Sequence, residues 1–284
     1  MKRQKVSFIG LGSSSFTPLL YSYLREHPEV NIPEAGTNFF SDMATYVQGI
    51  DWYENNFSGC DTGGKCGELA CRYLEHLPAA NLIAETYPSA RLFAVIGNPL
   101  LGVRIDYLEA LSSGKITDDI TLAGFIKSYP ETLTKYLFGK QLTHYYSYYS
   151  PTDLMVIVGS DLVDDPLKVL SDFFDYLEID PKFVPLVLKS LIADEEDLGQ
   201  HKPGFIKRTL KLIWRIVTKP YYIVLAKLKK PDILPDRLWR KAKQIPISSD
   251  LEEYLVKYYY KDVKTLSALL HRDLIEEWGM EKLK

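Results

Sequence analysis

The chain has 284 residues, of which 46% are hydrophobic and 25% are charged, and its formal net charge at pH 7 is −3. This composition is typical of a globular protein with a sizeable core, and we expect one large domain spanning residues 1–284. The charge balance gives no overall attraction to nucleic acid or to an anionic membrane, so any basic site must be local.

The chain opens with a strand, a turn and a helix. Residues 5–9 form a short apolar run that predicts a buried strand, Gly10 to Ser15 form a flexible Gly/Ser loop, and Thr17 to Glu26 have helical spacing. The apolar run from Val6 to Leu11 is too short for a signal peptide or a membrane span, because it is broken by glycines. We therefore expect a cytoplasmic protein with no transmembrane span.

Two further strands alternate with helices along the chain. Residues 91–96 and 154–158 are apolar runs that predict strands, and helical patterns follow them at 100–111 and 165–177. This alternation predicts an α/β fold with a central parallel sheet flanked by helices. Ligands bind such sheets at the carboxyl ends of the strands, so the loops at residues 10–17 and 97–106 are the expected site.

The three cysteines, Cys60, Cys66 and Cys71, are an odd number in a chain of cytosolic appearance. We therefore expect no disulfide framework, and their spacing does not match a zinc site. They are expected to be ordinary small buried residues, and no metal is predicted.

The composition changes between residues 202 and 243, where 13 Lys and Arg side chains accompany only two Asp, interleaved with Trp and Tyr. Three interpretations are open: a solvated helical hairpin packed on the domain, a basic lid over an anionic ligand, or contact with a membrane surface. A last helical pattern runs through residues 250–278.

Six segments occur in the order found in a known family. They are FIGLGSSSFTPLLYSYLREHPEV (8–30), TNFFSD (37–42) with GIDWYENNF (49–57), GELACRYL (67–74), ARLFAVIGNP (90–99), YYSPTDLMVIVGSDLVDDP (148–166) and YYYKDVKTLSALLHRDLIEEW (258–278). Over nearly its whole length the chain resembles the bacterial and heparan-type sulfotransferases, which use 3′-phosphoadenosine 5′-phosphosulfate (PAPS). The resemblance implies a P-loop-like, three-layer α/β fold.

The resemblance also implies a chemistry. Sulfuryl transfer depends on positioning and electrostatics, as phosphoryl transfer does. Backbone N–H groups of the first loop and the N-terminus of the following helix would hold the 5′-phosphosulfate, with contributions from Gly10, Gly12, Ser13, Ser14, Ser15 and Thr17. Asn98, which directly follows the second strand, would also contribute to binding the cofactor. Glu68 matches the residue that would accept the proton of the acceptor.

The chain departs from the family pattern where the donor would be held. In the first loop, Ser13 replaces the lysine of the family, Ser15 replaces a glycine and Phe16 replaces the first threonine. Gly97 replaces the arginine and Ile105 the serine that clamp the 3′-phosphate. Elsewhere, Leu69 replaces a lysine, and Gly204 and Phe205 replace a later Arg-Ser. Each charge-assisted contact that is lost costs about 1.5–3 kcal/mol of affinity. Arg104 is an imperfect substitute because it points to another side of the helix, and Lys202, Lys207 or Arg208 are further candidates.

Two functions remain open. In the first, the protein transfers a sulfuryl group from PAPS to a hydroxyl or amine of a small molecule, lipid or glycan, with Glu68 as base. In the second, the fold persists without donor binding and the protein acts as a binding or regulatory partner. A weaker alternative is another phosphorylated donor. His27 and His144 are interpreted as structural, and Asp161, Asp164 and Asp165 as helix caps.

Overall fold

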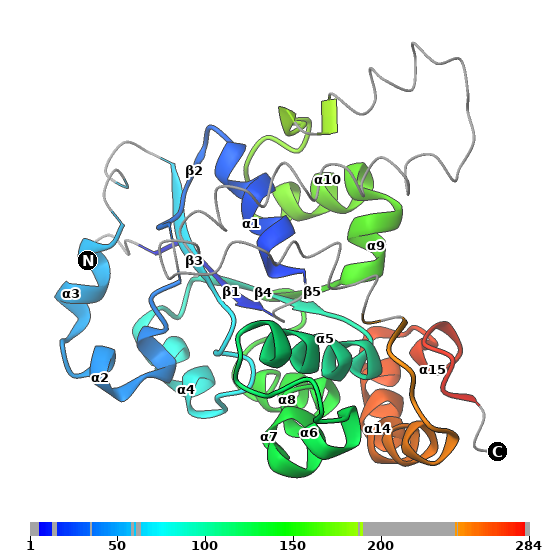
Figure 1. The fold of residues 1–284 in the computed structure, drawn as a ribbon. Helices are drawn as coiled ribbons and strands as arrows, with labels where there is room; N and C mark the ends of the chain where they lie inside the picture. The colour runs from blue at the N-terminus through cyan, green and yellow to red at the C-terminus, as the bar shows by residue number, and fades with distance from the viewer. Residues whose placement is uncertain are drawn as a thin grey trace.

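The structure is a computed structural model, and it describes residues 6–12, 16–34, 36–57, 60, 64–186, 188–189, 242 and 244–281. Five strands form one sheet in the order β2-β3-β1-β4-β5 (Figure 1). The strands are β1 (Phe8–Gly12), β2 (Val30–Asn31), β3 (Lys65–Ala70), β4 (Arg91–Ile96) and β5 (Leu154–Val158). Every neighbouring pair is parallel. The predicted α/β fold with a central parallel sheet is confirmed.

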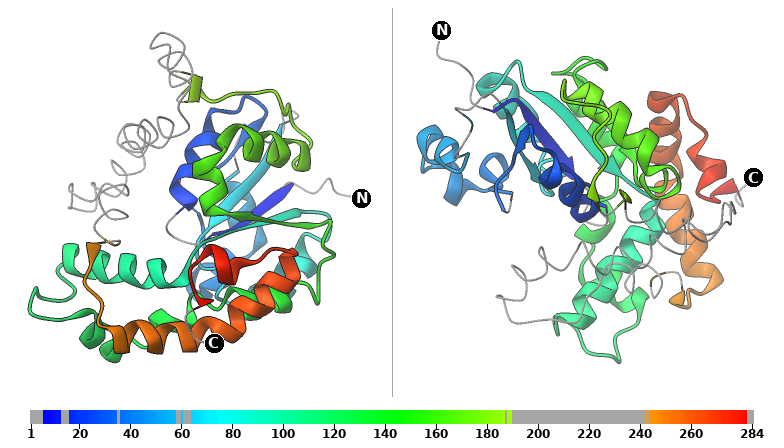
Figure 2. Two further views of the ribbon diagram at one scale, coloured as in Figure 1. Left: turned by 90° about the vertical axis from the view of Figure 1, so that its right-hand side faces the viewer. Right: turned by 90° about the horizontal axis from the view of Figure 1, so that it is seen from above.

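Helices cover both faces of the sheet (Figures 1 and 2). On one face lie α1 (Thr17–Glu26), α9 (Gly159–Asp164) and α10 (Pro166–Tyr176). The other face is covered by α4 (Pro78–Thr86), α5 (Pro99–Ser112), α6 (Leu122–Ser128), α7 (Glu131–Thr134), α8 (Phe138–Tyr145), α14 (Ser249–Leu270) and α15 (Leu274–Glu277). Beyond the β2 side of the sheet lie the 3₁₀ helix η1 (Phe39–Ser41) and the short helices α2 (Met43–Tyr46) and α3 (Ile50–Asn55).

The strands divide their side chains between two hydrophobic cores. In β1, Phe8 points to the core beneath α1 and α10, whereas Ile9 and Leu11 point to the core beneath α5 and α8. In β4, Phe93 lies in the first core and Leu92 in the second. Successive side chains of a strand point to opposite faces, so a continuous apolar run is what a sheet covered on both faces requires.

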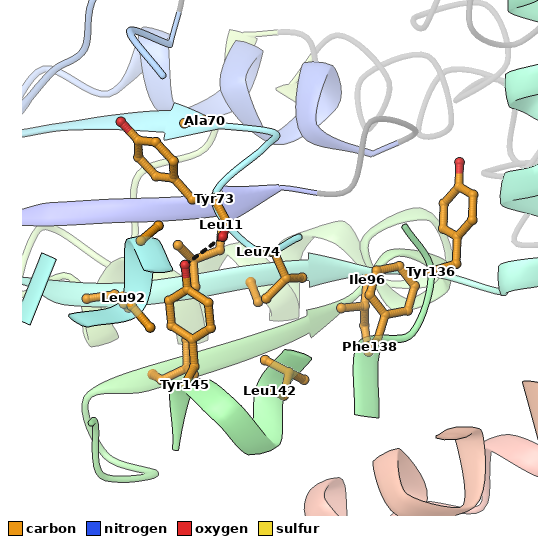
Figure 3. Close-up of a cluster of buried hydrophobic side chains, with 14 of the residues drawn as sticks. Leu11, Ala70, Tyr73, Leu74, Leu92, Ile96, Tyr136, Phe138, Leu142 and Tyr145 are labelled. Carbon is orange, nitrogen blue, oxygen red and sulfur yellow. Dashed lines mark hydrogen bonds between the residues drawn. The ribbon is translucent and has the colours of Figure 1, made fainter. Parts of the chain in front are cut away.

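Figure 3 shows part of the second core, where side chains from three strands meet those of α8. Leu11, Leu92 and Ile96 contribute from the sheet, and Leu142 packs against them from α8. Tyr145 is fully buried there, and its hydroxyl donates to the backbone oxygen of Tyr73 over 2.7 Å. This hydrogen bond satisfies a polar group that would otherwise destabilise the core.

Several predicted elements have the observed bounds. The helix at Thr17–Glu26 and the strands at Arg91–Ile96 and Leu154–Val158 are confirmed, and the tail is helical as predicted. The tail is interrupted, because His271 adopts the left-handed conformation (φ 50°) and ends α14 before α15 begins. Strand β1 extends to Gly12, so the prediction that the loop begins at Gly10 was wrong.

The expectation that the three cysteines are ordinary small residues outside any disulfide framework was wrong for two of them. Cys60 and Cys66 form a disulfide bond, and Cys71 is free. An odd number of cysteines does not exclude one local pair, and the two partners are only six residues apart. No helix in the part of the chain that the structure describes is long and apolar enough to cross a membrane.

Candidate active site

The carboxyl ends of β1 and β4 and the first turns of α1 and α5 lie at one edge of the sheet, where the site was expected. Gly12 ends β1, and a Cβ atom at this position would lie 2.3 Å from Thr17 Oγ1. Glycine is therefore required for the start of α1 to approach the strand so closely. Thr17 is buried, and its side chain hydrogen-bonds the thiol of Cys71. Ser13, Ser14 and Ser15, between them, lie outside the described residues.

Gly10 is part of the strand and not of the loop in which the sequence analysis placed it. It lies within β1, paired with Leu69 on one side and Phe93 on the other. A Cβ atom here would come within 2.6 Å of the Phe93 ring and 2.9 Å of the Leu69 side chain. Gly10 thus makes room for core side chains, and its assignment to the donor site stays a prediction.

Asn98 begins α5 as its N-cap. Its side-chain oxygen accepts a hydrogen bond of 2.9 Å from Leu100 N, and its amide nitrogen donates to Trp278 O over 3.4 Å. Pro99 occupies the first helical turn, where a missing N–H is tolerated. Asn98 and Pro99 therefore have a local role in initiating α5.

Arg104 lies on α5 and is partly buried. Among the described residues, its Nε atom is buried without a hydrogen-bond partner. The neighbouring Ile105 is buried and leaves no polar group at the position expected for a phosphate ligand. Arg104 stays a candidate ligand for an anion, as predicted. The other candidates, Lys202, Lys207 and Arg208, lie outside the described residues, as do Gly204 and Phe205.

The ring of Phe16 fills the space between the ends of β4 and β5. A Cβ atom on Gly97 would lie 2.8 Å from Phe16 Cε2, and one on Gly159 would lie 2.1 Å from Phe16 Cδ2. Phe16 is 7% exposed and belongs to the core beneath α1. The two glycines and the aromatic ring therefore form one packed unit, and an arginine at position 97 has no room while the ring is there.

Glu68 is fully buried on β3 and accepts four hydrogen bonds. Oε1 accepts from the hydroxyls of Tyr53 (2.8 Å) and Tyr73 (2.6 Å), and Oε2 accepts from Thr37 N (2.7 Å) and Thr37 Oγ1 (2.9 Å). Burial raises the pKa of this carboxyl group, and the four donors oppose the rise. With both oxygens occupied and no exposed surface, the geometry favours a structural role. Its assignment as a general base stays a prediction.

The histidines and aspartates that the sequence analysis interpreted as structural make structural contacts. His27 Nε2 lies 3.2 Å from Asp180 O, and His144 Nε2 lies 3.0 Å from Leu77 O. Asp165 caps α10 by accepting from Lys168 N, as predicted. Asp161 caps no helix in this way; it forms a two-pronged ion pair with Arg272 instead. The ion pair ties the end of α14 to the segment after β5.

A cavity of about 780 Å³ lies among α5, α7, α8 and the turn after β3. A small gap beside it is lined by Gly12 and Cys71, and the two spaces share Glu75, Lys135 and Gln141 as walls. The cavity therefore lies next to the gap at the end of β1. Among the described residues, no group of three or more His, Cys, Asp or Glu side chains could hold a metal ion.

Solved structures similar to this arrangement include sulfotransferases. The structure of a sulfotransferase from Alicyclobacillus acidocaldarius superposes with a TM-score of 0.67 at 19% identity, covering 96% of this chain and 98% of the other. The sulfotransferase domain from the curacin biosynthetic pathway gives a TM-score of 0.53 at 12% identity, covering 95% and 99%. The chain has the sulfotransferase fold.

Sequence comparison agrees with the fold. A human protein, heparan sulfate glucosamine 3-O-sulfotransferase 6, is 24% identical over 195 residues, which are 66% of this chain and 54% of that protein. The chain thus matches about half the length of this curated sulfotransferase. No protein-family model matches the sequence.

Within the sulfotransferase fold, sequence reasoning missed the contact of Phe16 with Gly159 and the residues around the large cavity. A signal for the first exists in the sequence, because β4 and β5 are both followed directly by glycine and α1 is preceded by an aromatic residue. No comparable signal marks the cavity, whose walls come from separate segments of the chain.

Proposed function

We propose that the protein transfers a sulfuryl group from PAPS to a hydroxyl or amine of a small molecule, lipid or glycan. The observation that carries the proposal is the arrangement at the edge of the sheet, where the first turns of α1 and α5 follow β1 and β4 in a sulfotransferase fold. Helix N-termini attract anionic groups because their N–H groups are unpaired. In this proposal α1, with Thr17, faces the phosphosulfate, and Asn98 and Arg104 lie near the nucleotide.

Calorimetric titration with adenosine 3′,5′-bisphosphate, the product nucleotide, tests the proposal. We expect saturable binding with a Kd of about 1–100 μM. The Arg104→Ala variant should bind more weakly, because a charge-assisted contact contributes about 1.5–3 kcal/mol. No heat at millimolar nucleotide would contradict the proposal.

A second candidate function is favoured by the packing of Phe16. In this candidate the chain keeps the fold, does not bind the donor and acts as a binding or regulatory partner. The supporting observation is that the Phe16 ring occupies the space over Gly97, where the family carries a phosphate-binding arginine.

Variants that restore the family residues at positions 13, 97 and 16 distinguish the two candidate functions. Because a side chain at position 97 clashes with the ring, Ser13→Lys with Gly97→Arg should fail to improve nucleotide binding. Adding Phe16→Thr should then strengthen binding at least tenfold, which corresponds to about 1.4 kcal/mol. Equal binding by the double and triple variants would show that the ring does not obstruct the site.

A further inference from the structure

The helices η1, α2 and α3 form a lobe that projects beyond the β2 edge of the sheet (Figures 1 and 2). Among the described residues, eight large hydrophobic side chains are exposed, and four of the eight lie on this lobe: Met43 (73% exposed), Tyr46 (37%), Val47 (72%) and Ile50 (39%). Because residues three and four apart share one side of a helix, Met43, Tyr46 and Val47 lie together on α2. Single exposed apolar residues are normal, but a contiguous group of them marks an interaction surface.

The exposed group rests on an aromatic base that is fixed to the sheet. The ring centre of Phe39 lies 5.2 Å from that of Tyr46, 6.2 Å from that of Trp52 and 4.8 Å from that of Tyr53. Tyr53 is fully buried, and its hydroxyl donates to Glu68 on β3 over 2.8 Å. The apolar side chains of the lobe are therefore held at the surface by the fold itself. A surface that is already ordered loses less entropy when a partner binds.

The lobe is also acidic. Between Arg25 and Lys65 the sequence contains seven Asp and Glu residues and no Lys or Arg. Asp42 and Asp51 flank the exposed apolar group in the sequence, and Glu54 follows one turn later on α3. None of these three carboxylates forms an ion pair with a residue that the structure describes. Negative charge around an apolar surface favours a partner that combines apolar side chains with positive charge.

We propose that the lobe is a docking surface for a cationic amphipathic helix of a partner protein. The apolar side chains of that helix cover Met43, Val47 and Ile50, and its Lys or Arg side chains pair with Asp42 and Asp51. An amphipathic helix carries both kinds of side chain on adjoining strips, and it binds other proteins through its apolar strip. A surface built on four exposed side chains is small, so the interaction is of the weak, transient class.

Charge disfavours the other occupants of such a surface. A second copy docked symmetrically would bring two acidic lobes together, and an anionic membrane would repel the carboxylates. The proposal concerns an interaction surface, and it does not depend on sulfuryl transfer or on nucleotide binding.

Fluorescence anisotropy on the full chain tests the surface with a labelled (LKKLLKL)₂ peptide, and (LEELLEL)₂ is its anionic counterpart. We expect the lysine peptide to bind with a Kd of about 10–100 μM and the glutamate peptide not to bind. Met43→Ser combined with Val47→Ser should weaken binding of the lysine peptide at least tenfold, equivalent to about 1.4 kcal/mol. Leu167→Ser removes a side chain on α10 that is 41% exposed, and this matched control should leave the affinity unchanged.

A charge variant tests the second part of the proposal. Asp51→Asn removes an exposed carboxylate from the lobe and should weaken binding of the lysine peptide about threefold at low salt. Because salt screens exposed charges, the loss should become smaller as the ionic strength rises. Asp175→Asn removes an exposed carboxylate from α10 and should have no effect.

Thermal melting followed by circular dichroism establishes that each variant is folded. Equal binding of the two peptides, no binding of the lysine peptide at about 1 mM, or an unchanged affinity in the folded Met43→Ser, Val47→Ser variant would overturn the proposal. Sedimentation equilibrium of the chain alone and flotation with phosphatidylcholine vesicles test the other occupants. A dimer, or vesicle binding, that this double variant abolishes would overturn it too, and would assign the surface to a second copy or to lipid.

Discussion

At the scale of single residues, Glu68 connects three segments that are far apart in the sequence. Its carboxylate receives hydrogen bonds from Thr37, from Tyr53 on α3 and from Tyr73 after β3. A buried carboxylate is tolerated only when its oxygens are satisfied, and a polar network of this kind fixes one arrangement of its members. Glu68 therefore holds α3 and η1 against the edge of the sheet.

Replacing Glu68 with glutamine tests this role. All four contacts donate to the carboxylate, and an amide has only one accepting oxygen, so we expect Glu68→Gln to lower the free energy of unfolding by about 3 kcal/mol. Urea denaturation measures the change, with Glu85→Gln, which removes an exposed carboxylate on α4, as the control. A variant of unchanged stability that has lost transferase activity would instead identify Glu68 as the general base.

The pH dependence of stability tests the environment of Glu109. Its pKa rises from an ordinary value of 4.5 to about 7 in the folded chain. The protonated carboxyl is favoured by folding, so its contribution to stability is complete below pH 4.5 and is lost as the pH rises through 7. Glu109→Gln removes this titration, and the variant should gain stability relative to the wild type between pH 5 and pH 8.

Denaturation of both proteins at several pH values measures the difference. The charges of Asp106 and Lys135 act on the same carboxyl group, and both residues are present in both proteins. A difference in stability that does not change with pH would contradict the raised pKa.

For single residues, the sequence predicted which positions depart from the family pattern better than it predicted which side chains touch. The family comparison located Phe16 and Gly97 as departures, but it could not show that one packs on the other. Glu68 was located by its match to the proton-accepting residue of the family, but its burial depends on tyrosines 15 residues before and five residues after it. Such partners are brought together only by the tertiary fold.

At the scale of elements, α14 provides a cap for another helix. The Asp262 carboxylate accepts hydrogen bonds from Gly139 N and Lys140 N, both of 2.8 Å, at the first turn of α8. α8 has no cap of its own, since Leu137 precedes it. The carboxylate accepts hydrogen bonds from N–H groups that would otherwise be unpaired, and its negative charge interacts favourably with the positive end of the helix dipole.

Asp262→Ala should therefore destabilise the protein by about 1–2 kcal/mol, as the loss of a helix cap does. Asp262→Asn keeps one accepting oxygen and should lose less. Chemical denaturation measures both variants, and hydrogen exchange at Gly139 and Lys140 should report the loss locally. Unchanged exchange at these two amides in the alanine variant would contradict the capping role.

The elements that the sequence predicted well share a simple physical origin. β4 and β5 are uninterrupted apolar runs because both faces of the sheet are covered, and α1 is delimited by Pro18 and His27-Pro28. β3 was missed because KCGELA contains a lysine, a glycine and a glutamate, which do not form an apolar run. The glutamate is buried only because its hydrogen-bond partners are supplied by other segments.

At the scale of the whole molecule, the disulfide joins Cys66 in β3 to Cys60 in the preceding connection. Cross-linking two residues this close in sequence stabilises a protein by about 2 kcal/mol on chain-entropy grounds. We expect a reducing agent to lower the melting temperature of the wild type, and Cys60→Ser to melt at the same lower temperature with or without the agent. An unchanged melting temperature after verified reduction would show that the bond adds no stability.

The fold as a whole was more predictable than its chemistry. The order of strands and helices follows from local apolar patterns and short connections, and it led to the correct three-layer fold. The donor site depends on residues at the ends of separate strands, and the large cavity depends on the packing of α5, α7 and α8. The sequence located the loops of the expected donor site, but the walls of the cavity come from spatial proximity and leave no pattern along the chain.

The packing of Phe16 on Gly97 and Gly159 limits the order in which these three positions can be substituted. While the ring is present, a side chain at position 97 or 159 would overlap it, so neither glycine can be replaced first. A smaller residue at position 16 would have to come before an arginine at position 97. A route to an arginine at position 97 must therefore begin at position 16, and this first step leaves an unfilled space in the core.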